Sequence, residues 1–337
     1  MLSYTLISRK AKRRLMTQVS KTLLYGHRMA FTIAYSFQII STVFVSCQSD
    51  SHGGAVYLNN QLLNCTIMFC SFDSCITTAS NGHGGGIAVQ QSFKTVISYS
   101  CFMKCRGYRC PGALIWGISN APNQYCMEAH NNMTSECNPD TSGGGSSYYS
   151  LGLLFYYNNN VTKSITNDIS AGFYFGVNSN SICGRYITVS LSQGPGLFGH
   201  AIYNNGIRNI IEYANFISSY VSPTGGLVHL HIMSNTVVLK NSAFSNCSFA
   251  NAVKRRDSTG TVEFVDCSFD SNSAGSSFIH ASTINCVFSS NPTLNIHKVL
   301  ETNICWVDNM QLNPPYTKIV VFYRHIFLTI FSQFITM

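Results

Sequence analysis

The chain has 337 residues, a net charge of +8 and only 10% charged residues. Globular proteins carry about a quarter charged residues, and a helical bundle needs Glu, Lys and Arg on its solvated face, so the composition argues against a helical protein. Abundant Asn, Ser, Thr, Gly, Phe and Tyr are typical of strands and turns instead.

Residues 1–36 open with the basic, acid-free segment "MLSYTLISRKAKRR". This concentration of charge predicts a solvated, partly disordered N-terminal arm. An organelle presequence and an arm for anionic membranes remain alternatives. We expect no nucleic-acid partner, because no aromatic residues interleave with the basic ones.

The segment "MAFTIAYSFQIISTVFVSC", residues 29–47, allows two interpretations. It follows basic residues and is apolar, as a signal anchor would be. Its last four residues, however, belong to a repeated motif, so "FQIISTVF" also fits an incoming β-strand. We favour strands and keep the anchor as the alternative.

Three related units follow between residues 44 and 116. Each has Phe-x-x-Cys (Phe44–Cys47, Phe72–Cys75 and Phe102–Cys105), then a short polar loop and a small-residue block. The first two blocks, "HGGAV" and "HGGGI", contain the pairs Gly53–Gly54 and Gly84–Gly85. Glycine allows a tight bend, so we expect each pair to form a corner that leads into a strand.

The same unit returns near the C-terminus. Phe244 is followed three residues later by Cys247, Phe269 by Asn272, and Phe288 by Asn291. Neighbouring blocks lie about 23 to 31 residues apart, within the range that marks solenoids. One coil cannot bury its apolar face, whereas stacked coils bury a continuous one. We therefore predict an all-β, single-stranded parallel β-helix of roughly 9–12 coils over residues 37–310.

These Gly-Gly-Ala and Phe-x-x-Asn or Phe-x-x-Cys motifs resemble the repeats of the polymorphic outer membrane proteins. They are similar, more specifically, to the right-handed β-helix proteins of flagellate protists that carry such repeats. The resemblance covers about residues 37–305 and is weakest over 117–215. It implies a right-handed, pectin-lyase-like solenoid with a surface or adhesion role, and it implies no reaction.

Residues 117–150, with two prolines and "SGGGSS", depart from the repeat. We expect a loop insertion there, of the kind that builds binding faces in solenoids. Cys126 and Cys137 are the best candidates for a disulfide in it. Asn132, in the sequon Asn132-Met133-Thr134, is the best candidate for glycosylation in a secreted chain.

The 14 cysteines include no Cys-x-x-Cys, which argues against a zinc ribbon or a thioredoxin-like site. Cys47, Cys75 and Cys105 share one repeat position and should form a buried ladder. Cys267 and Cys286 share another and should also stack.

Catalytic chemistry is not indicated. "HGGG" at 83–86 lacks the Gly-x-Ser-x-Gly that an oxyanion hole would serve, and no nucleotide-binding glycine motif is present. Glu263, Asp266 and Asp270 are the one tight acidic cluster and should flank a solvated turn. His52, His83 and His200 share a repeat phase and favour a stacked polar ladder over a metal site. We expect no catalytic, cofactor-binding or metal-binding residues and no cofactor.

The tail over residues 311–337 contains "IVVFYRHIFLTIFSQFITM", which is long enough to cross a bilayer. Arg324 and His325 within it would be costly there. A membrane segment and a cap on the open solenoid end both remain interpretations.

Three functions are compatible with these features. The first is a non-catalytic surface or adhesion β-helix that binds glycan or protein along the solenoid, at the cell surface or on a membrane. The second is a carbohydrate-active lyase or hydrolase. The third is a truncated paralogue without independent function, and a cytoplasmic location is the alternative to the surface.

Overall fold

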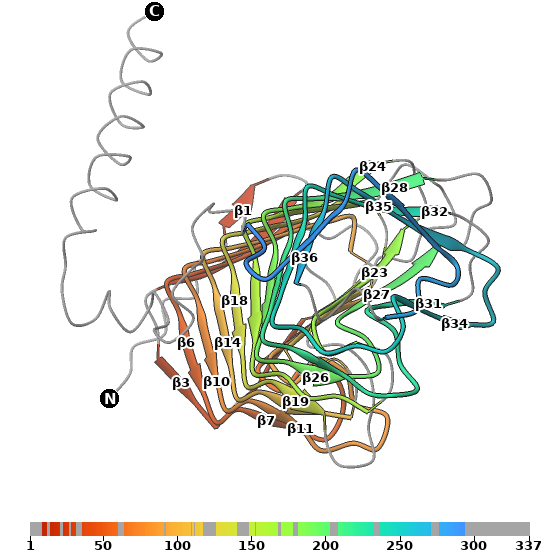
Figure 1. Ribbon diagram of the computed structural model, residues 1–337. Helices are drawn as coiled ribbons and strands as arrows, with labels where there is room; N and C mark the ends of the chain where they lie inside the picture. Colours follow the sequence, from red (N-terminus) through yellow and green to blue (C-terminus); the bar gives the residue numbers. More distant parts are fainter. Residues whose placement is uncertain are drawn as a thin grey trace, which may run out of the picture.

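The computed structural model is a stack of β-strand coils (Figure 1). It describes residues 9–293 except 12–13, 21–22, 27, 32–35, 60–63, 91, 109, 111, 117–125, 140–147, 152, 168–169, 178–180, 203–207, 232–235 and 271–275. No helix occurs among those residues. The all-β class expected from the composition is confirmed.

Three long sheets run along the stack. Sheet A has twelve strands, in the order β1 (Arg9–Ala11), β2 (Arg14–Ser20), β5 (Ser36–Ile40), β9 (Asn64–Met68), β13 (Lys94–Ser98), β17 (Cys126–His130), β21 (Leu153–Tyr157), β24 (Ser181–Arg185), β28 (Arg208–Glu212), β32 (Thr236–Lys240), β35 (Thr261–Val265) and β37 (Ala281–Ile284). Sheet B has eleven: β3 (Leu23–Tyr25), β6 (Val43–Val45), β10 (Ser71–Asp73), β14 (Cys101–Met103), β18 (Met133–Ser135), β22 (Asn160–Thr162), β25 (Thr188–Ser190), β29 (Asn215–Ile217), β33 (Ala243–Ser245), β36 (Ser268–Asp270) and β38 (Val287–Ser289).

Sheet C has nine strands, in the chain order β4 (Met29–Phe31), β8 (Val56–Asn59), β12 (Ile87–Gln90), β16 (Ala113–Trp116), β20 (Tyr148–Leu151), β23 (Phe173–Val177), β27 (Phe198–Ile202), β31 (Val228–His231) and β34 (Val253–Arg256). Two short sheets lie between sheets B and C. They contain β7 (Gln48–Ser49), β11 (Ile76–Thr77), β15 (Arg106–Gly107) and β19 (Asn138–Pro139), and then β26 (Gln193–Gly194) and β30 (Tyr220–Val221).

The order of strands in each sheet defines a parallel β-helix. The chain passes from sheet A to sheet B and then to sheet C before it begins the next coil, and neighbours in a sheet pair parallel, as in β10 with β6 and β14. The pair β1 and β2 is antiparallel. Sheet B takes one strand from each coil.

Phenylalanine stacks form the centre of the core. Phe72 is in register with Phe44 and Phe102, and the ring centroids are 4.8 and 4.9 Å apart. Near the C-terminal end the stack resumes through Phe216, Phe244, Phe269 and Phe288 at 4.8, 4.5 and 5.1 Å. Thr134, Val161 and Val189 occupy the same position in the middle coils. The repeated phenylalanine in the sequence therefore marks one stacked position that continues from coil to coil.

The glycine pairs make the predicted corner before sheet C. Gly53 and Gly84 have φ angles of 66° and 70°, a region that side chains rarely adopt. A Cβ atom at Gly84 would lie 2.0 Å from the carbonyl oxygen of Ile87. The following strand β8 then alternates as expected, with Val56 and Leu58 buried and Tyr57 half-buried.

The described residues of the segment predicted as a solvated, partly disordered N-terminal arm form strands. Strands β2, β3 and β4 pair parallel with β5, β6 and β8 and add a further coil. Exposed backbone groups on the edge strands of the next coil favour such pairing, whatever the charge of the incoming segment.

Within residues 29–47, strands β4, β5 and β6 confirm the strand interpretation. The described residues include no helix long and apolar enough to span a membrane.

The predicted loop insertion over 117–150 is also corrected. Residues 126–139 form β17, β18 and β19 in register with the coil before, and 148–151 form β20. Thr134-Ser135-Glu136-Cys137 stands where other coils have Phe-x-x-Cys, and this change of residue concealed the repeat. Residues 117–125 and 140–147, the tail 311–337 and Asn272 lie outside the described residues.

Removing one ring from the stack should destabilise the solenoid. We expect Phe72→Ala to cost about 3–5 kcal/mol of unfolding free energy, since the ring is fully buried and stacked on both sides. Urea unfolding followed by circular dichroism measures this. Thr66→Ala, on the outer surface of β9, is the matched control and should cost about 0.5 kcal/mol or less. Equal losses for the two variants would contradict the assigned orientation.

Candidate functional site

A band of aromatic and charged side chains lies on the outer surface of sheet A and on the turns that lead from its strands toward sheet B. We call this band the corner face. Its members are Phe69, Lys94, Tyr99, Glu128, His130, Phe155, Tyr157, Arg185, Tyr186, Glu212 and Tyr213.

Strand alternation directs these side chains outward. Ile97, Ala129 and Tyr156 are fully buried and follow one another in register, so they point into the core. Their neighbours along each strand must point the other way. Glu128 is thereby placed next to Phe155, and His130 next to Tyr157, on adjacent strands of the outer surface.

The turn itself adds the remaining aromatic residues. Tyr99, Tyr186 and Tyr213 have φ angles of 49°, 54° and 58°, an uncommon conformation for residues other than glycine. Non-glycine residues take this conformation at the corresponding turn of many coils, so the bend is a constant feature of the fold.

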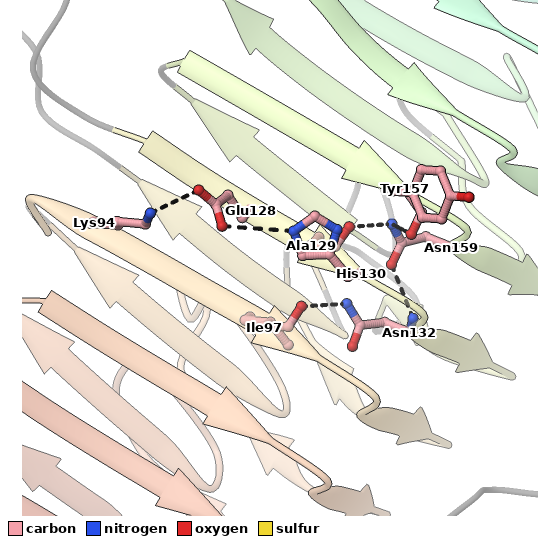
Figure 2. A network of polar contacts seen from close by, with 8 residues as sticks. All are labelled: Lys94, Ile97, Glu128, Ala129, His130, Asn132, Tyr157 and Asn159. Carbon is pink, nitrogen blue, oxygen red and sulfur yellow. Dashed lines mark hydrogen bonds and ion pairs between the residues drawn. The ribbon is translucent and has the colours of Figure 1, made fainter. Parts of the chain in front are cut away.

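Buried asparagines hold the bend from inside (Figure 2). The Nδ2 of Asn132 donates to the carbonyl of Ile97 at 2.8 Å, and the Nδ2 of Asn159 donates to that of Ala129 at 2.8 Å. The Oδ1 of Asn159 accepts from the backbone N–H of Asn132 at 3.1 Å. These bonds satisfy backbone groups that the bend removes from the sheet, and they fix the spacing of the side chains above them.

Ion pairs set the charge of the corner face. Figure 2 shows Lys94, Glu128 and His130 converging: Lys94 Nζ lies 2.7 Å from Glu128 Oε1, and His130 Nε2 lies 3.7 Å from Glu128 Oε2. On later coils Arg185 Nε lies 2.8 Å from Glu212 Oε2. Such partly exposed ion pairs add little to the free energy of unfolding. They do hold hydrogen-bond donors and acceptors in fixed positions on the corner face.

Ring contacts connect the coils across this face. Phe69 and Tyr99 stack at 5.1 Å, and His130 lies 5.7 Å from Phe155. The ring of Tyr186 meets Tyr157 edge-on at 5.4 Å and stacks on Tyr213 at 5.1 Å. Tyr99 and Phe155 are 42% and 40% exposed, so aromatic surface is available to a ligand.

The sequence prediction had identified none of these residues as a site. A signal existed in Tyr99, Tyr186 and Tyr213, each of which follows the last residue of a sheet A strand. These tyrosines stand out only when the strand ends and their register are known, because aromatic residues are common throughout the chain.

The carboxylates of the corner face are well separated. Glu128 and Glu212 lie on β17 and β28, three strand spacings apart in sheet A, which is about 14 Å. Glycosidase carboxylates lie about 5 to 9.5 Å apart.

The predicted solvated acidic turn near residue 266 is found for two of its three residues and is wrong for Asp270. Glu263 faces outward and Asp266 is exposed, whereas Asp270 is buried and accepts from the backbone N–H of Cys247 at 3.2 Å. No cluster of three potential metal ligands occurs among the described residues.

The expected histidine ladder forms for two of its members. The rings of His52 and His83 lie 5.3 Å apart, and the backbone N–H of His83 donates to Nδ1 of His52 at 3.2 Å. Burial, together with the charge of Arg28, lowers the pKa of His52. A neutral ring suits the acceptor role that His52 plays at the glycine corner. The side chain of His200 lies outside the described residues.

The predicted cysteine ladder is also present. Cys47, Cys75 and Cys105 are buried free thiols on successive coils, and Cys137 extends the row. The thiols of Cys75 and Cys105 donate to the carbonyls of Phe44 and Phe72 one coil earlier, at 3.7 and 3.3 Å. Cys267 and Cys286 precede the paired residues Ser268 and Val287 on successive coils, as their shared position predicted, and their thiols donate to the carbonyls of Leu239 and Phe264, both at 3.3 Å.

Two expectations for residues 126–137 are corrected. Cys137 is a free thiol of the inner ladder, so the predicted Cys126–Cys137 disulfide is wrong. Asn132 is 2% exposed, and both its amide nitrogen and its amide oxygen are hydrogen-bonded inside the corner, so it is not a glycosylation acceptor in the folded protein. Both errors follow from placing these residues on a projecting loop instead of inside a coil.

Comparison with known proteins gives no match to any family model, curated protein or solved structure.

Thiol reactivity should divide the cysteines by position. Burial raises the pKa of Cys70 and Cys247 to about 12, whereas the hydrogen bond from Cys267 lowers the pKa of the half-buried Cys286 to about 7. Iodoacetamide at pH 8 should therefore label Cys286 before Cys70 and Cys247 in the native protein, as read by mass spectrometry. Labelling in urea is the control and should reach Cys70 and Cys247 as well. Fast native labelling of Cys70 would contradict its burial.

The same burial predicts how stability depends on alkaline pH. A thiol whose pKa is raised on folding stays protonated in the native state, while the unfolded chain loses that proton near its ordinary value of 9.0. The free energy of unfolding should therefore fall as the pH rises above about 9.

Proposed function

We propose that this protein is a non-catalytic β-helix that binds a glycan chain along the corner face, as a surface or adhesion protein. The observation that carries the proposal is the set of aromatic rings held at a spacing of about one coil beside fixed charge pairs. The alternative is that the same face binds a protein on another surface, and the binding experiment below distinguishes the two ligands.

The chemistry of the face suits a carbohydrate. Sugar rings have apolar C–H faces that pack on aromatic rings, and their hydroxyl groups both donate and accept hydrogen bonds. Tyr99, Phe155, Tyr186 and Tyr213 supply the rings, while the Arg185–Glu212 pair supplies donors and acceptors beside them. Each position is fixed by the backbone register, so little side-chain entropy is lost on binding.

The repeats support the surface assignment. The Gly-Gly-Ala and Phe-x-x-Cys motifs resemble those of polymorphic outer membrane proteins, and extended solenoids present long binding surfaces. The wide separation of Glu128 from Glu212 also favours binding over glycoside cleavage.

Tyr186→Asn combined with Tyr213→Asn should abolish most of the glycan binding. Asparagine tolerates the left-handed turn conformation, so the rings are removed without straining the bend. We expect affinity for the best glycan on a polysaccharide array, measured afterwards by calorimetry, to fall at least about tenfold.

Tyr220→Asn is the matched control for this double variant. Tyr220 is a more exposed tyrosine (41%) than these two and lies on β30, away from sheet A, so its loss should leave the affinity unchanged. Glycan binding that survives the double variant would overturn the proposed site. If the protein bound only a cell-surface protein, the ligand of the corner face would be a protein and not a glycan. If it released new reducing ends from a bound polysaccharide, the protein would be an enzyme and not a non-catalytic binder.

Protease treatment of intact cells tests the location. If the solenoid lies at the surface, a tag placed after residue 293 should become cleavable on live cells, while a cytosolic reporter stays intact. A tag that is cut only after the cells are lysed would contradict the surface assignment.

A further inference from the structure

Three charged side chains lie in line on the outer surface of sheet A, at the ends of β24, β28 and β32. Arg185 is in register with Glu212, and Glu212 is in register with Lys240. The residues before the last two, Ile211 and Leu239, are fully buried in the core. Alternation along a strand therefore turns Glu212 and Lys240 outward, next to Arg185 on the corner face. We call Arg185, Glu212 and Lys240 the charged row.

The charged row contains two cations and a single carboxylate. Glu212 Oε2 accepts a hydrogen bond from Nε of Arg185 at 2.8 Å, so this carboxylate is already engaged by one cation. Among the described residues, no carboxylate oxygen lies within 4.0 Å of Nζ of Lys240. The row therefore has an excess of positive charge, and Lys240 is the residue that carries it.

The two cations also keep hydrogen-bond donors for a ligand. Arg185 donates to Glu212 through Nε, and a guanidinium has further N–H groups on its two terminal nitrogens. These groups form a planar fork that matches the paired oxygens of a carboxylate or a similar oxyanion. The Arg185 side chain is 40% exposed, so a ligand can reach the fork. The ammonium group of Lys240 adds donors from a neighbouring position of the row.

Aromatic rings lie directly beside the charged row. Arg185 is followed in the chain by Tyr186 and Glu212 by Tyr213, and the rings of these tyrosines stack at 5.1 Å. At the same turn of the next coil, Lys240 is followed by Asn241. Because each turn residue adjoins a member of the charged row, a sugar that packs on the tyrosines places its substituents next to the cations.

Acidic residues limit this positive region on the C-terminal side. On the next coil Glu263 is in register with Val238, and Asp266 occupies the turn, where Nδ2 of Asn285 donates to its Oδ1 at 3.3 Å. These carboxylates would repel an anion that approached from that side. The charges therefore favour an anion between β24 and β32, which lie two strand spacings apart, or about 10 Å.

We propose that the glycan bound at the corner face is anionic, and that Arg185 and Lys240 bind a carboxylate or sulfate group of a sugar whose ring packs on Tyr186 and Tyr213. This inference rests on glycan binding at the corner face and adds the chemical class of the ligand. Both groups offer a negative charge spread over oxygen atoms that accept hydrogen bonds. Glu212 is a positioning residue, since it holds the guanidinium through Nε and leaves the terminal nitrogens to the ligand.

Three forms of one polysaccharide test the charge requirement on the full chain. Chondroitin sulfate carries carboxylates and sulfates, chondroitin carries carboxylates alone, and carboxyl-reduced chondroitin carries neither. We expect calorimetry to show at least about tenfold weaker binding of the neutral form than of the best charged form, and salt to weaken only the charged forms. Tight binding of the sulfated form alone would identify sulfate as the bound group, and equal binding of both charged forms would identify carboxylate. Equal results for all three forms would overturn the proposal.

Variants of the cations test the assigned residues. Lys240→Gln removes the charge and should weaken binding of the charged form about tenfold while leaving the neutral form unchanged. Arg185→Lys keeps the charge but loses the planar fork, so it should weaken binding severalfold. Lys163→Gln is the matched control, because it changes the net charge equally but removes a lysine that pairs with Glu136 beside sheet B. Equal losses for Lys163→Gln and Lys240→Gln would overturn the assignment to the charged row.

The two proposals fail in different ways. If neutral and anionic glycans bind equally, and the double variant Tyr186→Asn with Tyr213→Asn abolishes both, the corner face binds glycans and the requirement for an anion is wrong. If no member of the polysaccharide array binds, glycan binding itself is wrong, and the anionic class falls with it.

Discussion

Hydrogen bonding between successive coils in one fixed register is the constraint on which the structure depends. The backbone N–H of Ile76 donates to the carbonyl of Cys47, and that of Arg106 to the carbonyl of Cys75, one coil apart each time. Paired positions in the described strands therefore lie directly on the same positions of the next coil, apart from a register shift between Ile182 and Gly184 in β24. A coil has no core of its own, so the stacked positions together are the core.

The same register organises the outer surface. Rings at Tyr157, Tyr186 and Tyr213 contact one another because the backbone places them on neighbouring coils, and the asparagines inside the bend fix its shape. A ligand that meets this surface finds groups whose positions are already determined by folding. Preorganisation of this kind reduces the entropic cost of binding, which is why solenoid faces make suitable binding tracks.

Sequence reasoning recovered the ladders that are built from one residue type. Phenylalanine, glycine and cysteine recur because only a few residues fill those positions, and the repeat could be read directly from them. Where Thr134 replaces phenylalanine, packing tolerates the change but the pattern disappears, and a regular coil was predicted to be a loop. Outward positions such as Glu128 and Phe155 carry no packing requirement, so no period in the sequence marked the corner face.

Position in the coil also decides what a cysteine can do. In-register residues on parallel strands keep their Cβ atoms about 4.8 Å apart, beyond the roughly 3.5–4.5 Å that a disulfide prefers. Cys47, Cys75 and Cys105 can therefore remain thiols at adjacent positions, even in an oxidising compartment. Cys101 packs with Met133 in a separate cluster, apart from this ladder, and is disulfide-bonded.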